Sequence, residues 1–267
     1  MPSLTLDKMH TSCSPEGGLI EYSLTLDDNS KLELNPLLGK ELTLSFHGET
    51  ECIHCHQRKV ARQGSCWGCL NTLACNDLCI MKPETCHYAQ GTCREPSWGE
   101  KYCMQDQTLY LSRSAGIKIG ITRGGNHMTR WADQGAIEGM VIGTFKDRLD
   151  VGLAEKAISS GGIGDRTSWQ KMLKNDVTDA PFDEVFEQAK SFLNEAQLAK
   201  LIIAPKAIKL EYPHLEWPKK VKSMKFDKMP YFCGTLTAIK GQYLIFDDQV
   251  INIRSHAGYR IDLSYEE

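Results

Sequence analysis

The sequence predicts an α+β protein built from several small modules. Three observations support this prediction. At 267 residues, the chain exceeds the usual size of a single domain. Apolar and polar residues alternate at both ends of the chain, which is the pattern of half-buried strands. Between these ends, nine of the eleven cysteines fall within residues 52–103, and strand and helix patterns follow them.

Composition places the chain among ordinary folded proteins, with 41% apolar and 24% charged residues. The net charge of −3 and the isoelectric point near 6.3 exclude a protein that coats nucleic acid through a generally basic field, so a site for a polyanion must be local. The first residues lack a basic segment followed by an apolar core, and no run of 18 apolar residues occurs. We therefore expect a soluble, cytoplasmic protein without a membrane partner.

The two ends of the chain are expected to fold together. Within residues 1–50, the runs "LIEYSLTL", "KLELN" and "ELTLSF" predict antiparallel strands, and residues 206–267 contain three or four more, with Asp247 and Asp248 at a turn. Because short isolated hairpins are marginally stable, we expect both ends to share one small antiparallel β barrel or sandwich. In its basic stretch "PKKVKSMKFDK", Lys219, Lys220 and Lys222 are candidates for phosphate contact, although a solvated loop explains them equally well.

Residues 51–105 form a cysteine-rich segment that predicts metal binding, because a chain without an export signal seldom uses disulfides. Cys52 and Cys55 form one C-x2-C pair, and Cys66 and Cys69 form another after ten intervening residues. Two such pairs can close a tetrahedron of sulfur around Zn²⁺, which leaves no position for a substrate and makes the site structural. Buried free cysteines are the alternative.

A second metal site is expected within the same segment. The remaining thiols are one too many for a tetrahedron, and we select Cys79, Cys86, Cys93 and Cys103, with Cys75 or His87 as a substitute ligand. An iron–sulfur cluster could also use four cysteines. Few aliphatic residues occur here, so metal is expected to replace a hydrophobic core. His54 and His56 are expected to be exposed residues of the knuckle rather than ligands.

Residues 106–178 begin with a hairpin, "LYLSRSAGIKIGITR", in which Ile117, Ile119 and Ile121 alternate and should face the core. A turn at Ser114 and Ala115 would place Tyr110 across from Gly120 and diagonal to Lys118. The pattern next predicts a helix from Asn126 to Gly135 that carries Arg130, and a strand over 139–145. A helix over 150–158 follows, capped by Asp150 and ended by Gly161 and Gly162, with Leu153, Ala154, Ala157 and Ile158 on its apolar side.

This order of elements resembles the GIY-YIG nuclease superfamily, and most closely its compact phage-type branch. "TLY" stands where that family has GIY, "KIG" stands where it has YIG, and Arg130, Glu155 and the tail "DRTSW" follow in the family's order. Lys118 replaces the usual Tyr, and the 25 residues from Arg130 to Glu155 are fewer than in repair and homing members. The whole chain, with "RWADQGA" and "IKGQYLIFDD", also resembles an uncharacterised bacterial family of unknown function.

The resemblance implies a small α/β nuclease domain with flanking helices and four catalytic residues. Glu155 would bind Mg²⁺ or Mn²⁺, and Arg130 would hold the phosphate. Tyr110 would relay or remove the proton of the attacking water, with Lys118 lowering the pKa of the phenol. The nearby candidates for phosphate contact are Arg123, His127 and Lys156, and His127 is also a candidate for proton transfer.

Residues 179–205 predict a connecting helix whose packed side carries Phe182, Val185, Phe186, Ala189, Phe192 and Leu193. The functional hypothesis is divalent-metal-dependent cleavage of DNA or RNA, with nucleic acid as the partner. No Gly-rich phosphate loop or Ser/His/Asp constellation is present, and no small-molecule cofactor is expected. One alternative is a noncatalytic zinc protein that binds nucleic acid or assists RNA processing. Another is a zinc-stabilised protein-interaction module.

Overall fold

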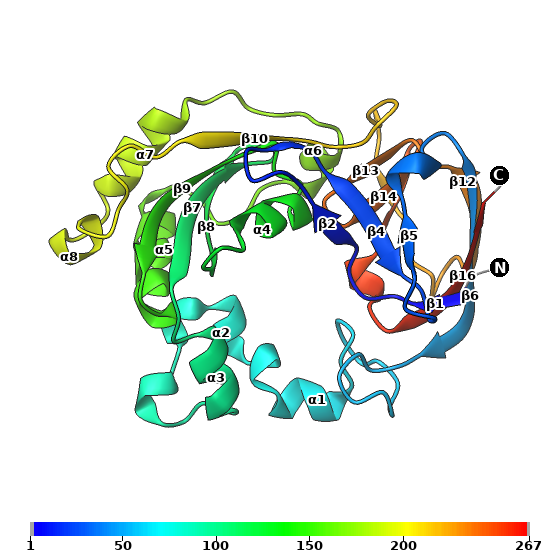
Figure 1. The fold of residues 1–267 in the computed structure, drawn as a ribbon, viewed down its shortest axis with the longest axis horizontal. Helices are drawn as coiled ribbons and strands as arrows, with labels where there is room; N and C mark the ends of the chain where they lie inside the picture. The colour runs from blue at the N-terminus through cyan, green and yellow to red at the C-terminus, as the bar shows by residue number, and fades with distance from the viewer. Residues whose placement is uncertain (1–2, 266–267) are drawn as a thin grey trace.

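The computed structural model describes residues 3–265, which form four small sheets and several short helices (Figure 1). The central five-stranded sheet has the order β3-β10-β9-β7-β8. Its strands are β3 (Gly18–Leu19), β7 (Gln107–Arg113), β8 (Ile117–Arg123), β9 (Glu138–Phe145) and β10 (Ala207–Glu211). Strands β7 and β8 form the predicted hairpin, and Tyr110 lies opposite Gly120 as expected.

The central sheet includes two strands from outside the predicted middle domain, residues 106–178. Strand β10 was assigned to the C-terminal module, but it pairs antiparallel with β9, and β3 from the N-terminal region pairs parallel with β10. One face of this sheet carries Leu109, Leu111 and Ile119 into a core with helices α5 (Arg148–Gly161) and α7 (Phe182–Lys190). The opposite face carries Tyr110 toward Trp131 of α4 (His127–Asp133).

Helix α5 (Arg148–Gly161) begins earlier than the sequence pattern predicts. Its cap is Asp147, whose carboxylate accepts the backbone N–H of Asp150, so the expected cap at Asp150 is wrong. Gly162 terminates the helix, and its φ of 122° is a backbone conformation that residues other than glycine rarely adopt. Leu153, expected on the apolar side, is 49% exposed, because the buried side of the helix turns toward Val151, Ala154 and Ile158.

The predicted connecting helix is two helices, α7 (Phe182–Lys190) and α8 (Glu195–Leu198). The break falls at Asn194, which caps α8. Oδ1 of Asn194 accepts the backbone N–H of Gln197, and Oε1 of Gln197 accepts the backbone N–H of Asn194. The predicted packed side is confirmed, because its residues lie in or against the core beneath the central sheet. Helix α6 (Trp169–Leu173) precedes α7.

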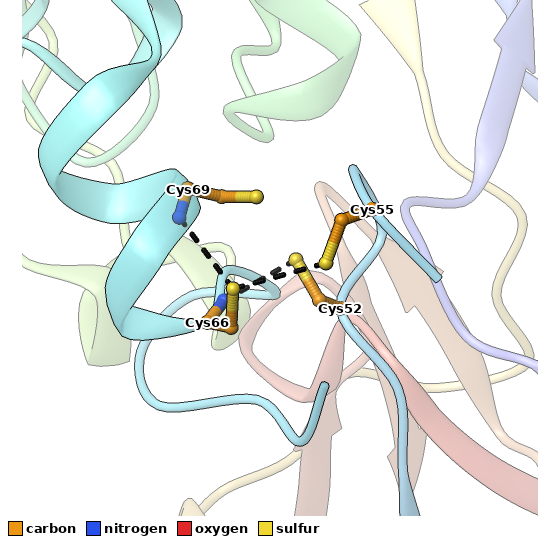
Figure 2. Close-up of side chains that lie close together, drawn as sticks. All are labelled: Cys52, Cys55, Cys66 and Cys69. Atoms are coloured by element: carbon orange, nitrogen blue, oxygen red, sulfur yellow. Dashed lines mark hydrogen bonds between the residues drawn. The ribbon is translucent and has the colours of Figure 1, made fainter. Parts of the chain in front are cut away.

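The cysteine-rich segment consists of short helices, with its first four cysteines gathered near α1 (Figure 2). Its elements are α1 (Trp67–Thr72), η2 (Ala74–Asn76), α2 (Leu78–Met81), η3 (Pro83–Thr85), η4 (Tyr88–Gln90) and α3 (Pro96–Tyr102). Cysteines are prominent among its buried side chains, as the scarcity of aliphatic residues predicts. The segment packs on α5 so closely that a Cβ on Gly152 would lie 2.5 Å from the backbone of Pro83.

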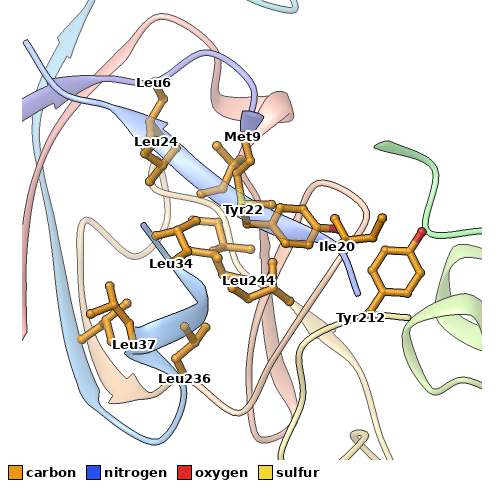
Figure 3. Packing of buried hydrophobic residues seen from close by; sticks show 14 of the residues in the cluster. Leu6, Met9, Ile20, Tyr22, Leu24, Leu34, Leu37, Tyr212, Leu236 and Leu244 are labelled. Atoms are coloured by element: carbon orange, nitrogen blue, oxygen red, sulfur yellow. The ribbon is translucent and has the colours of Figure 1, made fainter. Parts of the chain in front are cut away.

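The remaining three sheets contain the two ends of the described chain and share one apolar core (Figures 1 and 3). Their orders are β1-β16-β6-β12, β11-β15-β14-β13 and β2-β4-β5. The strands are β1 (Ser3–Thr5), β2 (His10–Ser12), β4 (Glu21–Thr25), β5 (Lys31–Glu33), β6 (Glu41–Thr50), β11 (Lys222–Ser223), β12 (Tyr231–Thr235), β13 (Ala238–Lys240), β14 (Tyr243–Phe246), β15 (Gln249–Asn252) and β16 (Tyr259–Tyr265), with turns η1 (Asn35–Leu37) and η5 (Arg254–His256).

The expected pairing of the two ends is present, because β1 and β6 both pair antiparallel with β16. A closed barrel, one of the two expected forms, is absent, since within residues 3–265 these strands form open sheets. In the sheet β1-β16-β6-β12, the edge strands β1 and β12 do not pair with each other among the described residues, so its hydrogen bonding does not close into a cylinder. The predicted turn at Asp247 and Asp248 is confirmed between β14 and β15.

Among the described residues, no helix is long and apolar enough to cross a membrane.

Candidate functional site

The first candidate site is a cluster of four cysteine sulfurs held by two separate pieces of chain (Figure 2). Cys52 and Cys55 follow strand β6, while Cys66 caps helix α1 and Cys69 lies in its first turn. The backbone N–H of Cys66 lies 3.3 Å from the sulfur of Cys52, and that of Cys69 lies 3.5 Å from the sulfur of Cys66. Backbone donors thus surround the sulfurs, as they do around thiolates.

The cluster has the dimensions that zinc requires. Its sulfurs all lie within 4.8 Å of one another, and those of Cys55 and Cys66 are 3.8 Å apart. A zinc tetrahedron with bonds of about 2.3 Å separates its sulfurs by about 3.8 Å. Burial opposes ionisation of Cys52, but hydrogen bonds from the backbone of Cys55, Cys66 and His54 outweigh it and lower its pKa to about 6. The predicted first zinc ligands therefore form a group that fits the metal.

The second predicted set is gathered only loosely. Cys79, Cys86 and Cys103 are buried, and Cys93 is partly exposed. Burial, followed by the charges of Asp77 and Cys86, raises the pKa of Cys79 to about 11. In residues 3–265, these four sulfurs do not all lie within 4.8 Å of one another.

A different set is compact at this position. Asp77, Cys79 and His87 lie within 4.8 Å of one another, and the carboxylate of Asp77 is also 2.7 Å from Nε of Arg94. Of the two substitute ligands considered, His87 therefore lies in this group, and Cys75 does not. His54 and His56 are exposed as expected, and His56 pairs with Glu51 at 2.7 Å.

The second candidate site is a cavity of about 710 Å³ beside the edge strand β8. All four residues predicted to be catalytic line it, although they come from four different elements. Tyr110 lies on β7, Lys118 on β8, Arg130 on α4 and Glu155 on α5. The fold therefore brings together side chains that are up to 45 residues apart in the sequence.

Tyr110 is fixed at the floor of the cavity. Its ring lies over Gly120, where an added Cβ would come within 2.6 Å of the phenol, and it meets Trp131 edge-on with ring centroids 5.8 Å apart. Its hydroxyl donates a hydrogen bond to Oε1 of Gln134 at 3.2 Å. Burial raises the pKa of Tyr110, and Arg130 opposes the rise. The expected lowering of this pKa by Lys118 is therefore wrong, because desolvation of the phenolate dominates.

Lys118 and Glu155 have pKa values moved toward neutrality. Burial, reinforced by the positive charge of Arg130, lowers the pKa of Lys118 to about 8. Burial and the negative charge of Asp165 raise the pKa of Glu155 to about 7, against the opposing effect of Arg148 and Arg130. Groups with such values exchange protons readily near neutral pH, and they are concentrated at functional sites.

The cavity is strongly basic in a chain of net charge −3. Seven cationic side chains line it against three carboxylates. Two of the cations have acidic partners within 4.0 Å, Lys8 with Asp133 and Arg166 with Asp165. The other five have no carboxylate partner among the described residues, and they are Lys118, Arg123, Arg130, Arg148 and Arg254. Nε of Arg130 is buried without any hydrogen-bond partner in residues 3–265.

Comparison with known proteins places the chain in a family. A family model described as "Protein of unknown function (DUF2797)" matches residues 39–261. The chain belongs to the DUF2797 family. No curated protein and no solved structure matches it. The match covers the cysteine cluster and all four candidate catalytic residues of this DUF2797 protein.

The other residues predicted to contact nucleic acid are mostly outside the cavity. Arg123 lines it, with its guanidinium 4.7 Å from the ring centroid of Tyr102. His127 instead packs on Trp131, and Lys156 is exposed and does not line the cavity. Three surface lysines of the terminal sheets lie elsewhere, and these are Lys219, Lys220 and Lys222. Lys222 pairs with Asp248 at 2.8 Å.

Sequence reasoning missed several cavity residues of the DUF2797 chain. Asp165 and Arg166 lie in the stretch "DRTSW", whose position after the Glu-bearing helix was the available signal. Arg148 starts α5 and donates to the carbonyls of Cys79 and Ile80, which ties the helix to the cysteine-rich segment. Lys8 and Arg254 come from the terminal sheets, and no local pattern connects them with the middle of the chain.

Proposed function

We propose that this DUF2797 protein binds nucleic acid through the cavity beside β8 and hydrolyses a phosphodiester bond there with a divalent metal. The observation that carries the proposal is the group of five basic side chains without carboxylate partners around Glu155. Uncompensated charge in a partly enclosed site is costly unless an anion offsets it. A phosphate backbone supplies that charge repeatedly.

The roles follow from the chemistry of each side chain. Arg130 holds the phosphate, and its buried, unpartnered Nε supplies a donor that becomes stronger as negative charge develops. Lys118 accepts the proton of the attacking water, because a pKa of about 8 leaves part of the amine neutral near neutral pH. Tyr110 stays protonated and positions the water or the phosphate with its hydroxyl.

Glu155, with Asp165 in the same cavity, would hold Mg²⁺ or Mn²⁺. Such a metal would acidify bound water and offset charge on the phosphate. The order of the four catalytic candidates supports a GIY-YIG-like origin for the central domain, with β7 and β8 paired so that Tyr110 faces the glycine of "KIG".

We also propose that Cys52, Cys55, Cys66 and Cys69 bind one structural zinc ion, because their sulfurs have the spacing of a tetrahedral site. All eleven cysteines are unpaired in the described structure, which supports a reducing, cytoplasmic location.

The test compares the wild type with Glu155→Gln on structured RNA and on branched DNA, each with Mg²⁺ or Mn²⁺. The control is Glu184→Gln, which removes an exposed carboxylate from α7. Cleavage by the wild type and the control but not by Glu155→Gln supports the proposal. Binding without cleavage by all three supports the noncatalytic alternative. Failure of the wild type to bind either nucleic acid at low salt contradicts the proposal and favours a protein-interaction module.

A further inference from the structure

The cavity beside β8 is completed by two cations from outside the central domain. Lys8 lies between β1 and β2, and Arg254 lies on the turn η5, so both belong to the terminal sheets. The five other cations of the cavity all come from residues 118–166. A second module therefore adds its own positive charge to the rim of the candidate active site.

Hydrogen bonds hold Lys8 in place against helix α4. Its amine contacts Asp133 at 3.1 Å, and Nε2 of Gln242 donates to the same carboxylate at 2.9 Å. The buried side chain of Gln242 also bonds the backbone of Met9. Its Oε1 accepts the N–H of Met9 at 2.7 Å, and its Nε2 donates to the carbonyl of Met9 at 3.0 Å. The loop that carries Lys8 is thus fixed relative to α4, the helix that bears Arg130.

Arg254 occupies a rigid turn, yet its side chain is free. The turn is anchored by His256, a buried side chain whose Nδ1 bonds the carbonyl of Asn252 at 2.8 Å, and by Ser255, whose backbone N–H donates to Oδ1 of Asn252 at 2.9 Å. The guanidinium of Arg254 is exposed and has no carboxylate within 4.0 Å among residues 3–265. A cation presented on a fixed turn without a partner is suited to an anionic ligand.

The opposite wall of the cavity is apolar and rises from the cysteine-rich segment, with Ile80, Met81 and Pro83 lining it. The reacting groups lie deep, since Tyr110 is 1% exposed and Lys118 is 9% exposed. A phosphate must therefore enter the cavity to reach them. A cavity of about 710 Å³ has the size of sites for small molecules, which corresponds to one or two nucleotides.

We propose that the substrate is an unpaired strand of nucleic acid, and that Lys8 and Arg254 bind the phosphates next to the one held by Arg130. This inference rests on the proposed function. A single strand can bend and send one phosphate into the recess while its neighbours stay at the rim. A duplex keeps its bases stacked, and it must unpair before a nucleotide can enter an enclosed pocket.

The test measures binding of short fluorescent oligonucleotides to the full chain carrying Glu155→Gln, so that cleavage does not interfere. The probes are a single strand and its duplex, each prepared as RNA and as DNA. We expect the single strand to bind about tenfold more tightly, which corresponds to about 1.4 kcal/mol, because the duplex must first unpair. The RNA and DNA arms identify which sugar the site accepts.

A second comparison adds Arg254→Gln to this protein, with Arg260→Gln as the matched control on strand β16. Arg260 is also exposed, and it lies 3.8 Å from Asp27 and Glu49 instead of facing the cavity. Removing one phosphate contact should weaken single-strand binding severalfold and reduce the slope of log affinity against log salt by about 0.7. The control should leave both quantities unchanged, and equal melting temperatures confirm that the variants fold.

Strand preference, the phosphate contact of Arg254 and nucleic-acid binding itself are tested by different outcomes. Equal affinity for duplex and single strand overturns the unpaired-strand inference and leaves the proposed function standing. An unchanged slope of log affinity against log salt in Arg254→Gln overturns the assignment of Arg254 as a phosphate contact. Binding to none of the probes overturns both the inference and the proposed function.

Discussion

Glu155 should destabilise the folded protein at neutral pH, so that replacing it with glutamine raises stability while abolishing cleavage. In the folded chain, burial and Asp165 raise the pKa of this carboxyl from its usual 4.5 to about 7. Below about pH 4.5, the carboxyl is protonated in both the folded and the unfolded chain. Between about pH 4.5 and 7, only the folded chain retains the proton, so the free energy of unfolding falls as pH rises.

The magnitude follows from the difference between the two pKa values. Each tenfold change in acidity corresponds to about 1.4 kcal/mol, so the full cost above pH 7 is about 3 kcal/mol. Glutamine has nearly the same shape and carries no charge, so Glu155→Gln should recover most of this energy. For a chain of this size, each kcal/mol moves the melting temperature by about 2–4 °C. The variant should therefore melt about 5–10 °C higher at pH 8.

Thermal unfolding followed by circular dichroism at pH 4 and pH 8 measures this effect, with Glu184→Gln as the exposed control. The gain should appear at pH 8 and vanish at pH 4. Added Mg²⁺ should raise the melting temperature of the wild type but not of Glu155→Gln, since binding to the folded state alone stabilises it. A gain of the same size at both pH values, or no gain at pH 8, would refute the assignment of a buried, charge-crowded carboxylate.

Three further predictions concern the cysteine cluster, the floor of the cavity and the proton acceptor. Cys52→Ser should lose the bound zinc, about one ion per chain by metal analysis, and should melt at a lower temperature. Cys233→Ser, at an exposed position, should keep the zinc and the melting temperature of the wild type. Gly120→Ala should cost about 1–3 kcal/mol in chemical denaturation and reduce cleavage, because its Cβ would displace the phenol ring above it. Gly116→Ala in the same hairpin has open space and should be neutral. In wild-type cleavage, the rate should rise with pH through about 8 as Lys118 loses its proton, and Lys118→Gln should show a flat, low profile instead.

Local patterns in the sequence predicted the parts of the site that local geometry determines. The register of the hairpin follows from alternation and a short turn, which place Tyr110 opposite Gly120. The spacing of the first four cysteines likewise predicts that their sulfurs gather around one centre, and they lie within 4.8 Å of one another. The predicted cap of α5 was wrong because Asp147 and Asp150 are both plausible caps, and sequence alone does not show which carboxylate meets a free N–H.

Features that depend on tertiary packing could not be predicted in the same way. Strand β10 joins the central sheet because β9 offers it an edge, and nothing within its five residues specifies that partner. The choice among the later cysteines depends on how η3 packs against α5, so spacing alone did not identify a compact group. Lys8 and Arg254 reach the cavity through the docking of one module on another, which leaves no periodic signal.

The pairing of β1 with β16 also determines when the fold around the cavity can be completed. These strands stand at opposite ends of the described chain, with Leu4 beside Ile261, so the first must wait until the last has left the ribosome. At about 5–20 residues per second, this delay lasts roughly 10–50 seconds. Lys8 lies three residues after the end of β1, and we therefore expect the cavity to acquire its full charge only after β16 has been made. Under the proposed function, a nascent chain that has not yet released β16 would then leave the nucleic acid around it uncut.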